Sequence, residues 1–208
     1  DIMDKGSYNN NGRTPPTYSA YERFYLGWLT PTQLTVGAYN LEPIAKSNKA
    51  YLIAANEHNL DGKNPDSKEF FLLENRHKDY ENDGVPANGM LVTHITYSRS
   101  KWNNNIVNND PDDMGVEVVC AFGTTSTPHQ NVFPGSAEKT SISFTIADAL
   151  IDTITSIVSE DNIISFVYGS PDFVPSVKTV GELEDFSVEF GQAAIQTLEL
   201  KGEGILDG

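Results

Sequence analysis

From residue 33 onward the chain is a succession of short strand-like runs separated by Gly, Pro, Asn and Asp. Short strands at this spacing, with turn-forming residues between them, are typical of a β-sandwich. We therefore predict a mainly β fold. The expected strands are Gln33–Val36, Tyr39–Ile44, Ala50–Ala54, Lys68–Arg76, Gly89–Tyr97, Val116–Phe122, Thr140–Ile146, Asp152–Ser159 and Asn162–Tyr168.

Two of these runs say more about their place in the fold. The run Phe70-Phe71-Leu72-Leu73 is apolar on both faces, which predicts a central strand covered on both sides. The last two strands are separated by little more than Glu160-Asp161, which predicts a hairpin turn at these residues.

One helix is expected, and it precedes all the strands. It begins just after Pro15-Pro16, where Thr17 or Ser19 can act as N-cap. Aromatic residues then recur three or four positions apart, at Tyr18, Tyr21, Tyr25 and Trp28, which predicts one aromatic face. The helix is expected to end at Thr30-Pro31, because the residue before a proline disfavours helical backbone angles.

A domain boundary is predicted within residues 169–175, which combine glycine, serine and two prolines. Beyond it, Glu184–Phe190 and Ile195–Lys201 read as two strands, too few for a stable domain. We divide the chain into a helix-bearing segment (1–32), a β-sandwich (33–170), and a linker with the start of a further Ig-like β domain or a packed tail (171–208). Neither end looks like a natural terminus, so we expect a piece of a longer secreted protein, here called the parent protein.

Composition limits the kinds of partner. The chain has 29 acidic and 14 basic residues, for a formal net charge of −15, which disfavours nucleic acid as a partner. No apolar run is long enough to predict a membrane span. The single cysteine, Cys120, lies in a strand-like run and rules out an internal disulfide or a cysteine zinc cluster.

The usual catalytic motifs are missing from the sequence. The four histidines are scattered, and none forms the His-Glu-x-x-His pattern that grips zinc from one helix face. There is no Gly-x-Ser-x-Gly nucleophile turn and no glycine-rich phosphate loop. The sequence therefore predicts no complete catalytic site within this chain.

Four segments in order carry a family resemblance. They are Asp1-Ile2-Met3-Asp4-Lys5-Gly6-Ser7-Tyr8, Ala20-Tyr21-Glu22-Arg23-Phe24-Tyr25-Leu26-Gly27-Trp28, Glu69–Arg76 and Gly89–Ile95. Together they closely resemble secreted zinc metallopeptidases of the immune-inhibitor-A type. In that family the first segment forms a methionine turn beneath the metal, and the Ala-Tyr-Glu-Arg helix follows it. Thr96 stands where the family usually has Asp, and the resemblance extends to about Gly135.

The resemblance implies a function for the parent protein rather than for this chain. The family's zinc ligands and catalytic glutamate lie upstream of the methionine turn, so none is carried over, and the chain alone is expected to be inactive. The resemblance implies that residues 1–32 are the C-terminal remnant of the metallopeptidase catalytic domain, with Met3 as the floor beneath the metal. For the parent protein the resemblance implies protein or peptide substrates, zinc bound by the upstream catalytic half, and calcium as a candidate second metal. It also implies a secreted or cell-envelope location, on the extracellular side of a bacterial cell.

Two further residues near this segment are candidates by position. Tyr8 is a candidate to donate a hydrogen bond to a developing oxyanion, and its alternative role is that of a packing tyrosine. Glu22 is a candidate to orient a metal ligand from behind, and its alternative role is a solvated or structural ion pair.

A structural polar cluster is expected between two central strands. Glu74 and Arg76 lie two apart on one strand and therefore share a face, and His94 lies on another predicted central strand. Because buried charges normally persist only when paired, we predict that these three residues form one buried cluster. A role in contacting substrate or supporting calcium is the functional alternative.

An acidic loop offers the oxygen ligands that calcium prefers, and calcium is a cofactor in the resembled family. Its candidate ligands are Asn108, Asp110, Asp112 and Asp113. A solvated turn is the alternative, and the loop from Asp61 to Asp66 is a weaker candidate of the same kind.

Three hypotheses follow for the parent protein. The first is a secreted zinc endopeptidase that hydrolyses peptide bonds through a metal-activated water. The second is a non-catalytic module that binds protein or glycan at the cell surface, for which exposed aromatic residues such as Trp102 would matter most. The third is a pseudopeptidase that has lost its zinc ligands. An exposed strand edge at a chain end would in addition favour pairing into a dimer.

Overall fold

The computed structural model describes residues 8, 11–78, 84–85, 87–122, 131–169, 176–180 and 199–203, and within them the fold is mainly β, as predicted. The helices are α1 (Ala20–Leu26), α2 (Ile44–Ser47) and α3 (Arg99–Asn103). The strands are β1 (Thr32–Gln33), β2 (Gly37–Leu41), β3 (Tyr51–Ile53), β4 (Glu69–Arg76), β5 (Gly89–Thr96), β6 (Val116–Val119), β7 (Val132–Phe133), β8 (Ile142–Ile146), β9 (Ala149–Glu160), β10 (Ile163–Tyr168), β11 (Ser176–Val180) and β12 (Glu199–Glu203).

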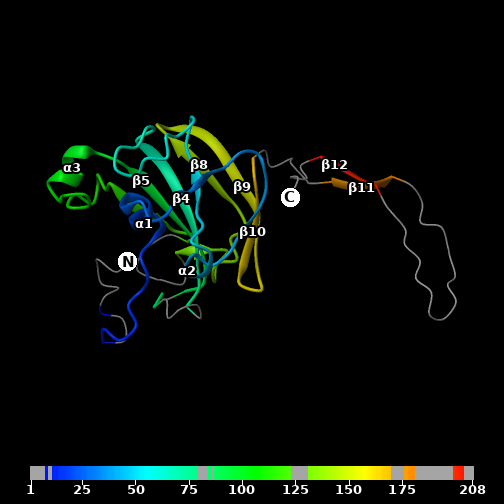
Figure 1. Ribbon diagram of the computed structural model, residues 1–208, viewed down its shortest axis with the longest axis horizontal. Coiled ribbons are helices and arrows are strands. Elements are labelled where there is room, and N and C mark those ends of the chain that lie inside the picture. The colour runs from blue at the N-terminus through cyan, green and yellow to red at the C-terminus, as the bar shows by residue number, and fades with distance from the viewer. Residues whose placement is uncertain are drawn as a thin grey trace.

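The strands form two larger sheets that pack face to face (Figure 1). One sheet has the order β1-β3-β4-β5-β6, and β7 also pairs with β5. The other is antiparallel, with the order β2-β10-β9-β8. Strands β11 and β12 pair with each other, antiparallel, in a separate two-stranded sheet.

The main hydrophobic core lies between the two larger sheets. Alternate residues of β4, Phe71 and Leu73, point into it, because side chains on a strand alternate between its faces. From the opposite sheet Phe144 and Ile154 fill the same space, and both are almost completely buried. The Phe71 and Phe144 rings meet edge to face with their centroids 5.0 Å apart.

A second core lies on the other face of β4, beneath α1. The remaining apolar residues of β4, Phe70 and Leu72, are buried there, and Phe70 meets Phe24 of α1 edge to face at 6.2 Å. Strand β4 is thus central in its sheet and covered on both faces, which confirms the prediction from its unbroken apolar run.

Helix α1 begins where the sequence predicts and ends earlier. Ser19 is the N-cap, and Ser19 and Glu22 form a reciprocal capping box. The helix ends at Gly27, which adopts the left-handed conformation with φ of 77°. The predicted end at Thr30-Pro31 was wrong by one turn, because the glycine stops the helix before the proline can.

The β9–β10 hairpin forms with its turn shifted by one residue. Asp161 and Asn162 occupy the turn with φ of 48° and 68°, the pattern of a type I′ turn, whereas Glu160-Asp161 was predicted. Of the two strands predicted near the C-terminus, Ile195–Lys201 overlaps β12, and Glu184–Phe190 lies outside the described residues.

Candidate functional site

The structure says least about the two N-terminal candidates, Met3 and Tyr8. Met3 lies outside the described residues, so its place beneath a metal stays a prediction. Tyr8 is described and 78% exposed, so it does not pack into either core. Its suggested contact with an oxyanion also stays a prediction.

A buried charge pair joins β4 to the start of α1. Glu74 and Arg76 lie on the α1 side of β4 and are 1% and 3% exposed. Arg76 Nη1 lies 3.5 Å from Glu74 Oε1, and Glu74 Oε2 accepts a hydrogen bond of 2.6 Å from the backbone N–H of Ala20. Arg76 Nη2 donates to the carbonyl of Thr17 at 3.2 Å. We call this arrangement the Glu74–Arg76 pair.

The Glu74–Arg76 pair fixes how the chain enters the helix. The N–H of Ala20 is among the first-turn donors that have no partner within the helix, and a carboxylate there also complements the helix dipole. The guanidinium holds the preceding backbone through Thr17. Because both side chains are removed from water, their mutual attraction offsets part of the cost of burying two charges. Residues 17–20 are therefore anchored to the centre of the sheet.

His94 does not belong to the Glu74–Arg76 pair, and the prediction of a three-residue cluster was wrong. His94 is the register partner of Phe71, so it lies on the opposite face of the sheet from Glu74. It stacks on the Phe71 ring at 4.4 Å, and its Nε2 lies 3.0 Å from Glu69 Oε1. Both members of the Glu69–His94 contact are partly exposed.

A shallow aromatic hollow of about 370 Å³ lies between α1 and α3. It is lined by Tyr18, Tyr21, Glu22, Tyr25, Leu26 and Trp102, and we call it the α1 groove. The rings of Tyr21 and Trp102 meet edge to face with centroids 6.1 Å apart. The Tyr21 hydroxyl is buried, and burial raises its pKa well above the usual value for tyrosine.

Among the described residues that line the α1 groove, Glu22 is the one acidic side chain. Its Oε2 accepts hydrogen bonds from the Ser19 backbone N–H at 2.6 Å and from the Ser19 hydroxyl at 2.8 Å. Its Oε1 is buried and has no hydrogen-bond partner among the described residues. Glu22 thus caps the helix with one oxygen and leaves the other unpaired. Whether it orients a metal ligand stays a prediction.

The side chains of Asn108, Asp110 and Asp113, three of the four predicted calcium ligands, make contacts within the loop or with the neighbouring helix α3. Asn108 Oδ1 accepts from the N–H groups of Gly115 and Val116, both at 3.0 Å. Asp113 Oδ1 lies 2.6 Å from Lys101 Nζ. Asp110 Oδ1 accepts from the Asp112 N–H at 3.0 Å. Among the described residues no group of three or more His, Cys, Asp or Glu side chains could hold a metal ion, and calcium binding at this loop stays a prediction.

The weaker candidate loop is organised by side-chain to backbone hydrogen bonds. Asp61 Oδ1 accepts from the N–H groups of Lys63 and Asn64 at 2.9 and 3.1 Å. Asn59 Oδ1 accepts from the N–H groups of Asp61 and Asp66, both at 3.1 Å. These oxygens serve the turns that shape the loop.

His58 is a buried titratable group that the sequence did not single out. It is 4% exposed and lies between the rings of Phe24 and Phe70, with centroids 6.1 and 4.8 Å away. Its Nδ1 accepts the backbone N–H of Leu60 at 2.9 Å. Burial lowers the pKa of His58, so the imidazole is held neutral. No periodicity marks it, because it lies in a loop.

Cys120 is the candidate nucleophile by residue type alone. It lies just after β6 and is half-buried. Burial, and in second place the Glu117 carboxylate, raise the pKa of its thiol, which disfavours the reactive thiolate. The structure therefore offers no support for cysteine chemistry here.

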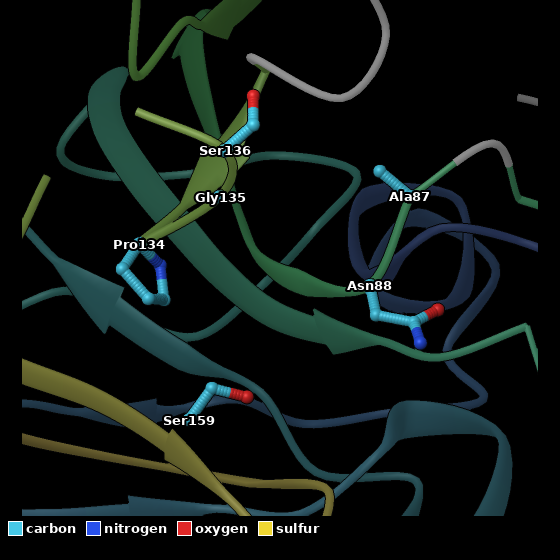
Figure 2. A pocket seen from close by; sticks show the side chains of 6 residues that line it. All are labelled: Ala87, Asn88, Pro134, Gly135, Ser136 and Ser159. Atoms are coloured by element: carbon cyan, nitrogen blue, oxygen red, sulfur yellow. The ribbon is translucent and has the colours of Figure 1, made fainter. Parts of the chain in front are cut away.

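A second hollow opens where β7 meets the β9–β10 end of the sandwich (Figure 2). Its lining consists of Ala87, Asn88, Pro134, Gly135, Ser136 and Ser159, which Figure 2 shows around the opening. The described lining residues provide hydroxyl and amide groups, and none of them is an acid, a base or a cation. These groups can offer hydrogen bonds to a ligand.

No helix among the described residues is long and apolar enough to cross a membrane. No protein-family model, no curated protein and no solved structure matches the chain. The features of this chain that bear on function are therefore the Glu74–Arg76 pair, the α1 groove and the sequence motifs.

Proposed function

We propose that this chain is the supporting part of a secreted zinc endopeptidase, the parent protein, and that it has no catalytic activity alone. The observation that carries the proposal is the Glu74–Arg76 pair, which anchors residues 17–20 to the central strand β4. The segment just before this anchor contains Met3, which the family resemblance assigns to the floor beneath the metal. A rigid anchor there would keep that floor in place.

In this proposal the zinc ligands belong to the sequence upstream of Asp1. The described residues contain no group of donors that would hold zinc. When bound, zinc supplies an activated water for peptide hydrolysis. The contribution of this chain is positional: Glu74 and Arg76 hold the entry to α1, and α1 packs on the sheet through Phe24. Small displacements of supporting residues can cost large factors in rate.

The test compares the chain alone with the parent protein that includes the upstream sequence. We expect about one zinc ion per molecule and cleavage of casein for the parent protein, and neither for this chain. Cleavage by the purified chain would overturn the proposal of an inactive support. A parent protein that has an intact His-Glu-x-x-His motif yet neither binds zinc nor cleaves casein would overturn the peptidase assignment.

A pseudopeptidase makes a different prediction from the same experiment. In that case the sequence upstream of Asp1 would lack the zinc-binding motif, and the parent protein would fold without zinc. Reading that upstream sequence separates the two hypotheses directly, because the motif is a matter of residue identity.

One observation favours a second candidate function, the binding module. The α1 groove presents several aromatic rings at one surface, and such surfaces are used to recognise proteins and sugars. A glycan array and a pull-down with the purified chain would test it. Blank results in both would leave the supporting role as the better explanation of the fold.

A further inference from the structure

We propose that the α1 groove binds the guanidinium group of an arginine side chain presented by a separate polypeptide. The inference does not depend on the zinc peptidase proposal, because it concerns only residues of this chain. It starts from two observations at one place: a cluster of aromatic rings and an unpaired carboxylate oxygen.

Within the described part of the chain, Glu22 carries a carboxylate oxygen that has no partner. Glu22 Oε1 has no hydrogen-bond partner among the described residues, and no ion pair of those residues includes Glu22. A carboxylate oxygen removed from water without a partner is costly. The nearest arginine along α1, Arg23, is turned away, because its guanidinium donates to the Tyr18 carbonyl and to Asn48. Because Glu22 lines the α1 groove, a cation seated there would offset its charge.

The aromatic rings that surround the hollow also favour a cation. Tyr21, Tyr25 and Trp102 line the same hollow, and the faces of such rings attract cations. Arginine suits this setting better than lysine, because its planar guanidinium is weakly hydrated and stacks on aromatic rings while donating hydrogen bonds.

The volume of the hollow and the net charge of the chain also favour a single basic side chain as the occupant. A hollow of about 370 Å³ falls at the lower end of the range of ligand pockets, which fits one side chain rather than a larger molecule. The chain's net charge of −15 would draw basic peptides toward it at low ionic strength. The occupant is therefore an arginine on an exposed peptide segment, and lysine is expected to bind less tightly.

The test uses the fluorescence of Trp102. The chain has two tryptophans, so the Trp28→Phe variant leaves Trp102 as the sole reporter, and Trp28 does not line the groove. The probes are a short peptide with one arginine, the same peptide with citrulline, which has nearly the same shape without the charge, and the same peptide with lysine. We expect saturable quenching by the arginine peptide and binding at least about tenfold weaker for citrulline.

The matched variants are Glu22→Gln and Glu160→Gln, both in the Trp28→Phe background. Glutamine at position 22 preserves the capping box, because Glu and Gln both serve there, so the helix should remain folded. Glu160 is exposed at the end of β9 in the opposite sheet, and its substitution changes the net charge equally. We expect Glu22→Gln to weaken arginine binding about five- to tenfold and Glu160→Gln to leave it nearly unchanged.

Three results would overturn the proposal. They are the absence of saturable quenching, equal binding of the arginine and citrulline peptides, and equal losses in the two variants. The last result would show a general effect of net charge rather than a site. Far-UV circular dichroism of both variants checks that α1 and the sandwich are intact.

Discussion

Replacing Glu74 with glutamine tests how strongly the sheet holds α1. The substitution preserves an oxygen that can accept the Ala20 N–H, but it removes the charge opposite Arg76. At 3.5 Å and an effective dielectric constant of about 20, the attraction between the two charges is roughly 5 kcal/mol. Desolvation of both side chains offsets part of it. Loss of one member of a buried pair typically costs about 3–5 kcal/mol, because the other charge stays buried.

We therefore expect Glu74→Gln to lower the free energy of unfolding by roughly 3 kcal/mol. Urea unfolding followed by tryptophan fluorescence measures it, since Trp28 and Trp102 both lie close to α1. The matched control is Glu69→Gln on the same strand. The side chains of Glu69 and His94 are 31% and 23% exposed, so Glu69→Gln should lower the free energy of unfolding by less than about 1 kcal/mol.

A double-mutant cycle separates the pair from other effects of the substitutions. Glu74→Leu combined with Arg76→Met replaces both charges by apolar groups, and the double variant should lose less stability than the sum of the single variants. If Glu74→Gln were no more destabilising than Glu69→Gln, or if the cycle were additive, the Glu74–Arg76 pair would not anchor α1.

Three further predictions concern other parts of the fold. Gly115→Ala would place a Cβ 2.7 Å from the Trp102 ring, so we expect a loss of about 1–3 kcal/mol and a shifted Trp102 emission, whereas Gly37→Ala, with its nearest contact at 3.5 Å, should cost little. Because the folded-state pKa of His58 is lowered, stability is full above its unfolded pKa of about 6.5 and decreases as pH falls below it. Urea unfolding at about pH 7.5 and pH 5.5 should show this decrease, and His58→Gln should make it smaller; an unchanged pH dependence would contradict the assignment. Calcium at the acidic loop should raise Tm relative to chelator, and Asp112→Asn should reduce that rise; equal Tm values for the native chain in calcium and in chelator would contradict the sequence prediction.

The parts of the fold that the sequence predicted are those set by local periodicity. The apolar run of β4 has no polar face, and a strand of that kind is stable only between two covering layers. The start of α1 could also be predicted from the local sequence. Ser19 and Glu22, which form the capping box, are only three residues apart and lie within one turn. Both predictions needed no knowledge of the rest of the chain.

Short elements could not be predicted in the same way. Helix α2 has 4 residues and α3 has 5, too few for a 3.6-residue period to appear. The α1 groove could not be predicted from the sequence either, because it brings Tyr21 and Glu22 together with Trp102, which lies on α3. The helical spacing of the tyrosines predicted an aromatic face, but the sequence could not say what lies opposite it.

The incorrect assignment of His94 shows why the candidate site needed the structure. Residues two apart on one strand share a face, so the pairing of Glu74 with Arg76 followed from the sequence alone. A residue on the next strand joins that face only if the register allows it, and a shift by one residue moves every side chain to the other side. The observed register places Leu91 opposite Glu74, and His94 opposite Phe71.

The register therefore separates two acidic residues of β4 that look alike in the sequence. Glu74 faces α1 and is shielded from water together with its arginine, so its charge affects the position of the helix. Glu69 lies on the face toward the sandwich core and shares a partly exposed contact with His94, where water screens the charge. It follows that a substitution on the α1 side of β4 should disturb the N-terminal segment, while one at Glu69 should leave that segment in place.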